Sequence, residues 1–419
     1  MEQNKFLNLT LSELGVLFAL NLLFFSQFLQ QQSEIFSYCD EVITIIFLVA
    51  AILAAATDDA HCLSKGESIA IVLFVIFIAI GFVSSSFVSL GISLVAQAID
   101  LFACVKFFLI YFSALVLFSL QTDDFCQKVK RWAIAEAKLL VVVMFLCALV
   151  NLTFDIGMSA EGERYGVRSF SFIFYHPTIV NFVVVGLVAL LLGNEVKNRL
   201  YIWMALAVML LTLRTKAFVF VAVYVLIQLM VKAGKKAGFL TILTVVLIAV
   251  LIGWDQFAAY QETGEARGEL LRTSFAIANE SFPLGSGFAS FASNVTAQPE
   301  YYSPLYYKYG INLIYGLGFV HTHYLSDTFW PIVIAQFGYI GLVILSLSLY
   351  YLFRSAAHRQ RTLNIRVLVP VLFYLLISST SESSIFNPMA VYLGLCLALM
   401  LAGKPSGPLK NKQLEMENK

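Results

Sequence analysis

The chain is built mostly of long apolar segments separated by polar connections. Twelve of these segments are long and apolar enough for helices that cross a membrane. The 419 residues are 60% hydrophobic and 13% charged, a composition that a water-soluble domain could not cover with polar surface. We therefore predict an all-α polytopic membrane protein that forms a single domain over residues 1–419. The predicted spans are 11–30, 41–56, 67–86, 94–120, 132–153, 177–193, 199–213, 217–233, 236–252, 330–353, 366–380 and 387–403.

The positive charges give the orientation of these spans. Most of the 27 Lys and Arg residues fall in every second connection, and cytoplasmic loops carry such an excess. Both termini are therefore expected in the cytoplasm, and the first span is expected to remain, because Met1–Lys5 is not the basic start of a signal peptide. Lys106 and Lys138 lie within spans. The basic residues on the outer side are Arg164, Arg168, Arg214, Lys216, Arg267, Arg272 and Lys308.

One outer connection, residues 254–329, is far longer than a typical loop. It contains an amphipathic stretch around Leu270 and Ile277, then Pro283–Phe288, then an aromatic run from Tyr301 to Tyr315. Tyrosine is common at the headgroup level of a membrane. The segment predicts short amphipathic helices that lie on the membrane face.

Basic residues on the outer side oppose the usual preference for the cytoplasmic side. Binding of an anionic substrate at that face is the best explanation for them. Arginine binds phosphate through paired N–H donors. For Arg164 and Arg267, contact with lipid headgroups or snorkelling from a helix end is the favoured interpretation. The candidates for substrate binding are Arg168, Arg214, Lys216 and Arg272.

His321 and His323 close the long loop, and a histidine can act as a general base near neutral pH. Their spacing also suggests a metal, but two histidines lack the further ligands of a zinc site, although Asp327 is near. His176-Pro177 is interpreted as a helix start. No glycine-rich nucleotide loop is present, so ATP coupling within this chain is not expected. Neither a cofactor nor a metal is predicted. Nucleic acid is not expected as a partner.

Four short motifs follow one another on the outer side. They are Thr212-Leu213-Arg214-Thr215, Arg272 followed by Pro283-Leu284-Gly285-Ser286-Gly287-Phe288, His321-Thr322-His323-Tyr324-Leu325, and Gly338-Tyr339-Ile340-Gly341. In this order and spacing the chain resembles the O-antigen ligase and Wzy-type polysaccharide polymerase superfamily of bacterial membrane proteins. Leu213 stands where that family commonly has Ser, and Thr322 where it has Asn.

The resemblance implies a glycosyltransferase of the multi-helix GT-C type in the bacterial inner membrane. It would be inverting and metal-independent, and it would use glycans linked to undecaprenyl diphosphate at the periplasmic face. Carried over, Arg214 and Arg272 hold the diphosphate and His321 deprotonates the acceptor hydroxyl. Arg168 is a further candidate for substrate binding because of its position on the outer side. Lys216 and His323 are the other predicted substrate-binding residues. The bilayer and a chain-length regulator are further candidate partners.

Three functions remain open. A polymerase of repeat units is preferred to a ligase that transfers polymer to lipid A–core, because the turn at Arg214 lacks the Ser-Arg pair and nothing marks a core-lipid acceptor. A flippase or transporter is the alternative of another class. It would need a polar path and repeat symmetry, whereas the spans hold few clear charges: Asp100, Lys106 and Lys138.

Overall fold

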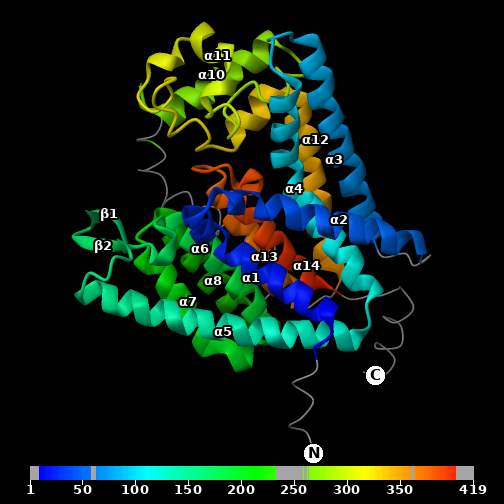
Figure 1. Ribbon diagram of the computed structural model, residues 1–419, viewed down its shortest axis with the longest axis vertical. Helices are drawn as coiled ribbons and strands as arrows, with labels where there is room; N and C mark the ends of the chain where they lie inside the picture. The colour runs from blue at the N-terminus through cyan, green and yellow to red at the C-terminus, as the bar shows by residue number, and fades with distance from the viewer. Residues whose placement is uncertain are drawn as a thin grey trace, which may run out of the picture.

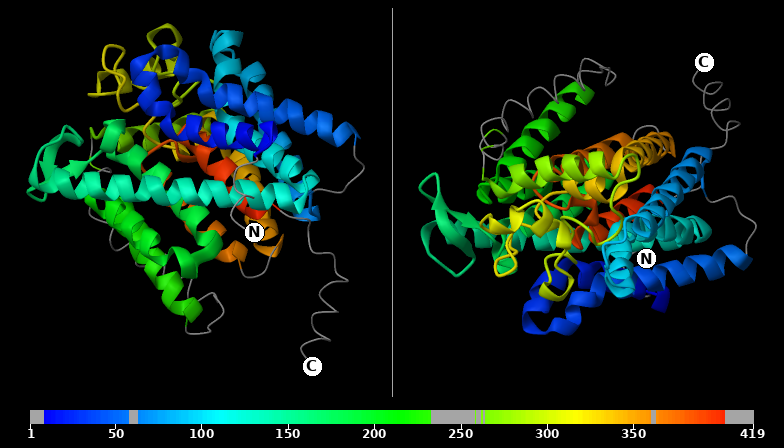
Figure 2. Two further views of the ribbon diagram at one scale, coloured as in Figure 1. Left: turned by 60° about the horizontal axis from the view of Figure 1, so that its bottom comes forward. Right: turned by 90° about the horizontal axis from the view of Figure 1, so that it is seen from above.

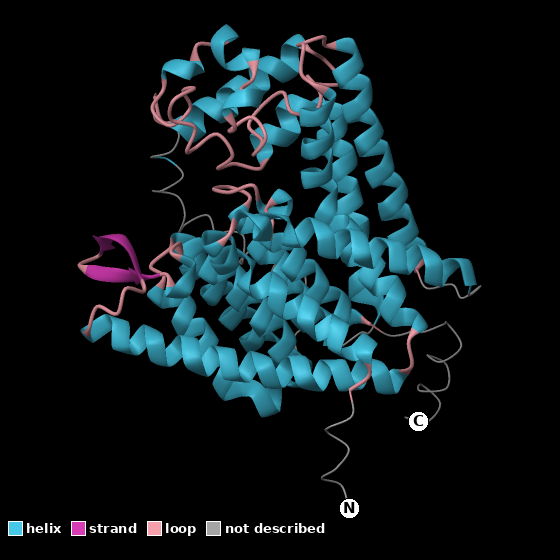
Figure 3. Ribbon diagram, in the orientation of Figure 1, coloured by secondary structure: helices cyan, strands magenta, loops and turns pink. Residues whose placement is uncertain are grey.

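The computed structural model describes residues 9–57, 63–232, 264–359 and 363–402, together with 258 and 262, and these are mostly helical (Figure 3). Before the long loop come α1 (Leu11–Gln32), α2 (Cys39–Thr57), α3 (Lys65–Phe87), α4 (Leu94–Leu120), α5 (Asp123–Thr153), α6 (Pro177–Leu191), α7 (Glu195–Leu211) and α8 (Thr215–Lys232). The long loop holds α10 (Ala266–Glu280) and α11 (Pro304–Lys308), and after it come α12 (Trp330–Arg359), α13 (Leu363–Ser378) and α14 (Met389–Leu401). Short 3₁₀ turns include η4 (Leu192–Asn194), η6 (Ile311–Leu313) and η7 (Ser384–Phe386).

Polar side chains explain where several helices begin. Thr10 caps α1 and Ser64 caps α3, and in both cases a glutamate three residues later completes a capping box. Ser93 and Thr122 cap α4 and α5 in the same way, through a hydroxyl oxygen that accepts a backbone N–H. These caps satisfy N–H groups that an apolar surrounding would otherwise leave unpaired.

The predicted membrane helices are confirmed in part. Every predicted span except 236–252 overlaps a helix, and 236–252 lies outside the described residues. Within the described residues, seven helical stretches are long and apolar enough to cross a membrane, which is fewer than the twelve expected. Four reasons explain the difference. The stretch Pro177–Leu211 joins α6 and α7 through η4, α8 and α14 contain only short apolar helices, α13 has 16 residues, and 236–252 lies outside the described residues.

The helices form two groups that cross each other. In Figure 1, α3, α4 and α12 stand together and reach the layer that α10 and α11 form. Helix α5 crosses the other end of the molecule in Figure 1, and the left view of Figure 2 shows it in front. It packs on α1, α6 and α7. Helix α14 is buried along its length between α4 and α6.

The long loop is fastened to the helices by Pro283–Phe288. Helix α12 is interrupted at Gly338, which has a φ of 63°, and the loop segment enters this break. Ser286 N donates to Ala335 O and Gly287 N donates to Gln336 O, both at 2.8 Å. The two glycine motifs of the sequence therefore meet and form one packed joint.

Two further contacts hold the same segment against α3 and α4. Phe288 N donates to Ser85 Oγ at 2.9 Å, and Ala289 N donates to Asp100 Oδ2 at 2.6 Å. Asp100 is 1% exposed, so this carboxylate serves as an anchor inside the helical body. A buried carboxylate is stable there because backbone and side-chain donors satisfy it.

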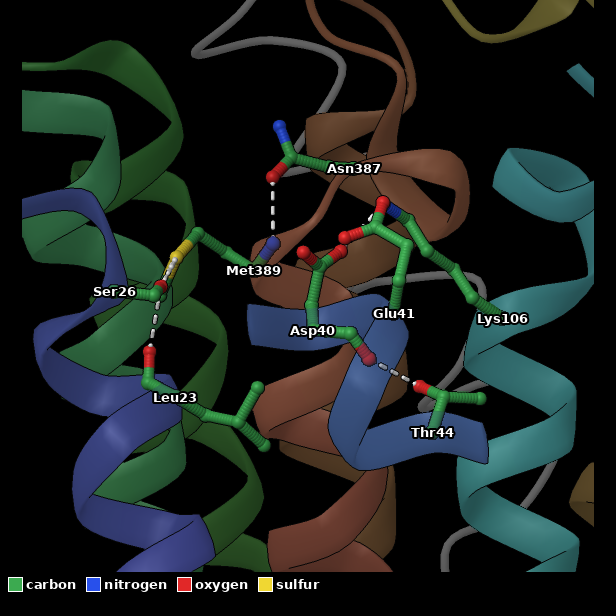
Figure 4. A network of polar contacts seen from close by, with 8 residues as sticks. All are labelled: Leu23, Ser26, Asp40, Glu41, Thr44, Lys106, Asn387 and Met389. Carbon is green, nitrogen blue, oxygen red and sulfur yellow. Dashed lines mark hydrogen bonds and ion pairs between the residues drawn. The ribbon is translucent and has the colours of Figure 1, made fainter. Parts of the chain in front are cut away.

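The two lysines predicted inside spans have partners. Lys106 on α4 lies 2.5 Å from Asp40 Oδ2 and 3.4 Å from Glu41 Oε1, both at the start of α2 (Figure 4). Lys138 lies 5.3 Å from the ring centroid of Tyr201, a cation–π contact. Pairing of this kind lowers the cost of a charge in an apolar surrounding.

A β-hairpin, which the sequence did not predict, projects beside α6. Strands β1 (Ser159–Arg164) and β2 (Val167–Phe170) are antiparallel and form the only sheet of the described residues. Tyr165 and Gly166 join them with φ values of 55° and 72°. Two residues with positive φ are the requirement of a type I′ hairpin turn.

Gly285→Ala should strongly destabilise the protein. Gly285 has a φ of 79°, and an added Cβ would lie 2.4 Å from Gly338 N and 2.7 Å from Ala335 O. We expect a cost of at least about 3 kcal/mol, since left-handed strain and overpacking add together. The control is Gly157→Ala, where φ is 73° and no atom lies within 4 Å. Equal melting temperatures of the two variants in detergent would contradict the packed joint.

Candidate functional site

The turn between α7 and α8 is held by the end of the hairpin. Ser169 Oγ, which follows Arg168 on β2, donates to Thr212 O at 2.5 Å, and the buried Thr212 hydroxyl lies 3.2 Å from Asn181 Oδ1 on α6. Leu213 has a φ of 51°, an uncommon conformation for this residue type. The turn is therefore constrained on both sides, and it presents Arg214 and Lys216 together.

Lys216 is buried and forms an ion pair with Glu382, which lies between α13 and η7. The side chains are 9% and 13% exposed. A charge at such a position needs a partner, because removing either member leaves the other without solvent and without a counter-ion. The pair therefore joins two loops that lie far apart in the sequence.

A second ion pair approaches from the long loop. Arg267, at the start of α10, lies 2.9 Å from Asp327 Oδ2, in the segment before α12. The charges of Arg214, Arg267 and Asp327 all act on Lys216, so the two ion pairs belong to one electrostatic group. Burial raises the pKa of Asp327, and the positive charges of Arg267 and Lys216 oppose this shift.

His176 lies at the same place. It is the residue before α6, with Pro177 in the first turn, as the sequence predicted. The pKa of His176 is lowered to about 4, mainly because burial disfavours the charged imidazole. The positive charges of Arg214, Lys216 and Arg164 lower this pKa further. One side of His176 nevertheless stays exposed to solvent. At neutral pH its ring is uncharged and can both donate and accept a hydrogen bond.

These residues form the cationic cluster, which draws on segments throughout the chain. Its members are Arg164, His176, Arg214, Lys216, Arg267, Asp327 and Glu382. Three arginines, which stay charged, and Lys216 face two carboxylates, and this leaves an excess of positive charge in the cluster. Such a place suits a ligand with at least two negative charges, and arginine favours phosphate oxygens.

The structure brings two of the six predicted site residues into this cluster, Arg214 and Lys216. Arg168 instead lies on the hairpin, 3.3 Å from Asp155 Oδ2. Arg272 is 42% exposed and pairs with Glu269 on its own helix. Since five residues correspond to about 140° around a helix, Arg272 and Arg267 point to different sides of α10.

His321 and His323 lie in the last turn of the long loop. Their rings stack with centroids 5.9 Å apart, both are exposed, and Tyr315 lies 6.2 Å from His321. Asp327 follows His321 by six positions, so their Cα atoms are at most about 21 Å apart. The role of His321 as a base stays a prediction.

The cluster also contains residues to which the sequence gave other roles or none. Lipid headgroups were the favoured contact of Arg164 and Arg267, and Glu382 was not singled out. A signal for Glu382 does exist, since it is the only charge in the run Ser378–Ser384, between two apolar helices. Its partner could not be found from that run, because Lys216 lies more than 160 residues away.

The described residues contain no candidate metal site. Groups of three or more His, Cys, Asp or Glu side chains that could hold an ion are absent among those residues.

No protein-family model matches the chain, and no curated protein matches it.

His176 should titrate near pH 4, well below the ordinary value of 6.5. Because the folded pKa lies below the unfolded one, the unfolded state binds more protons between these values, and stability should fall as the pH falls through that window. The measurement is the pH dependence of ¹⁵N-histidine resonances, assigned with His176→Gln. Arg214→Gln should move the midpoint upwards. A midpoint near 6.5 in the unaltered protein would show that the imidazole is neither desolvated nor close to the cations.

Proposed function

We propose that this protein is a membrane glycosyltransferase that uses a glycan linked to a polyprenyl diphosphate as its donor. In the most specific form, it polymerises undecaprenyl-diphosphate-linked repeat units into surface polysaccharide, as the resemblance to the O-antigen ligase and polymerase superfamily implies. The observation that carries the proposal is the convergence of Arg164, Arg214, Lys216 and Arg267 from three separate segments: the hairpin, the turn between α7 and α8, and the start of α10.

The site chemistry supports a diphosphate in particular. The transferred sugar leaves its carrier when the bond between the anomeric carbon and the phosphate oxygen breaks, and the electron pair stays on the diphosphate. Arg214, Lys216 and Arg267 would stabilise this charge, and fixed cations act strongly where water is partly excluded. Nothing else is needed to activate the leaving group.

The acceptor would supply a hydroxyl oxygen that attacks the anomeric carbon from the opposite side, which inverts it. A base must take the proton, and His321 remains the candidate. It lies on the same loop as Arg267 and Asp327, so one element would carry both the base and part of the diphosphate site. Closure of such a loop commonly excludes water from the reaction.

The proposed setting is the bacterial inner membrane, with twelve spans in a GT-C-like arrangement. Both termini would be cytoplasmic and the cationic cluster would face the periplasm. The seven long apolar helices among the described residues support a multi-pass membrane protein. The excess of basic residues in alternate connections supports the orientation.

A flippase is less well supported by the charges within the helices. Lys106 pairs with Asp40 and Glu41, and Asp100 binds backbone and loop donors. These groups hold the fold together, whereas a transport path would present them to a cavity. The excess charge is gathered in one cluster between the helices and the long loop.

Arg267→Ala should reduce glycan extension more than Arg272→Ala. Arg267 belongs to the cationic cluster, whereas Arg272 pairs with Glu269. Loss of one donor to a developing charge typically costs about 10²–10³-fold in rate. The measurement is polymer length in membranes that contain equal amounts of each variant. Lys308→Ala, in an exposed pair with Glu280, is the control and should remain active. A larger loss of activity in Arg272→Ala than in Arg267→Ala would indicate that Arg272 contacts the diphosphate.

Deletion of the gene in its host should leave single repeat units on an intact anchor, without long polymer. This follows from a polymerase, because the carrier-linked units would still be made and transferred. The measurement is surface glycan on a gel beside extracted lipid-linked precursors. Long polymer stranded on undecaprenyl diphosphate would instead identify a ligase. Repeat units trapped at the cytoplasmic leaflet would identify a flippase and contradict the enzyme.

A further inference from the structure

Each of two cations in the cluster already has an anionic partner. Lys216 pairs with Glu382 and Arg267 pairs with Asp327, and the second distance is 2.9 Å. The four residues come from four segments: the α7–α8 turn, the start of α10, the loop before α12 and the loop after α13. The charges of Arg267 and Asp327 act on Lys216, so the two pairs are neighbours.

We propose that Asp327 and Glu382 are internal counter-ions that occupy the positions of two linked anionic groups, and that a diphosphate binds by exchanging with both carboxylates. The inference rests on the proposed function and deepens it, because it names the two residues that set the selectivity of the anion site. A ligand with a single phosphate can replace one carboxylate. A diphosphate can replace two, and its phosphates are covalently joined.

The counter-ions reduce the electrostatic repulsion between the cations of the site when no ligand is bound. Arg214, Lys216 and Arg267 are neighbouring cations that are partly removed from water, and they would repel one another. Carboxylates from the surrounding loops neutralise part of this charge and keep the segments together. The same carboxylates must then be moved before a stronger anion can bind.

Both pairs have features that allow exchange. The side chains of Arg267 and Asp327 are 22% and 30% exposed, so water can reach this pair and hydrate a released carboxylate. The second oxygen of Glu382, Oε2, is buried and has no hydrogen-bond partner among the described residues. A carboxylate with one unsatisfied oxygen is held less firmly than one with all its bonds made.

The test is calorimetric titration of the full-length protein in detergent with inorganic pyrophosphate. Asp327→Asn is the main variant, because it removes the negative charge opposite Arg267, which remains charged at any working pH. Glu382→Gln is the second variant, since Lys216 could lose its proton once its counter-ion is removed. Glu280→Gln is the matched control, as Glu280 pairs with Lys308 on the exposed part of the same loop.

We expect Asp327→Asn to bind pyrophosphate about tenfold more tightly than the unaltered protein, and Glu280→Gln to bind with unchanged affinity. Adding Arg267→Ala to Asp327→Asn should remove the gain. Unchanged or weaker binding by a cooperatively melting Asp327→Asn variant would overturn the exchange. If that variant does not melt cooperatively, the same criterion applies to Glu382→Gln. Absence of binding by the unaltered protein and by both variants would overturn the anion site of the proposed function itself.

Discussion

The joint between Pro283–Phe288 and the break in α12 is the interaction on which the candidate site depends. Gly285 and Gly338 approach too closely for either to carry a side chain, and both adopt positive φ. The joint fixes the chain just after α10 and in the first turns of α12, so it determines where Arg267 and Asp327 can lie. A long loop without such an attachment could not hold a cation beside Lys216.

The helices could largely be predicted from the sequence, because an apolar stretch of sufficient length has few alternatives in a membrane. The start of α6 at Pro177 and the burial of Leu270 and Ile277 on α10 followed from the same local rules. The type I′ hairpin escaped prediction, since Tyr165-Gly166 is a weak turn signal beside strands of mainly polar residues.

The site was predictable only where its residues are neighbours in the sequence. Arg214 and Lys216 share one short turn, so the sequence placed them together. The partners Glu382 and Asp327 lie in other loops, and a contact between distant loops depends on how the helices pack. On α10 the sequence favoured Arg272, whereas the structure puts Arg267 beside Asp327, because the choice depends on which side of the helix faces the body.

The break at Gly338 also divides α12 into parts of different length. The part from Tyr339 to Arg359 spans about 31 Å at 1.5 Å per residue, which by itself matches the hydrocarbon thickness of a bilayer. The part from Trp330 to Phe337 adds only about 12 Å and packs with the long loop. The position of Gly338 therefore indicates how deeply α12 is inserted in a bilayer. A bilayer fitted to the longer part would have one of its boundaries at this glycine, level with the joint that attaches the loop.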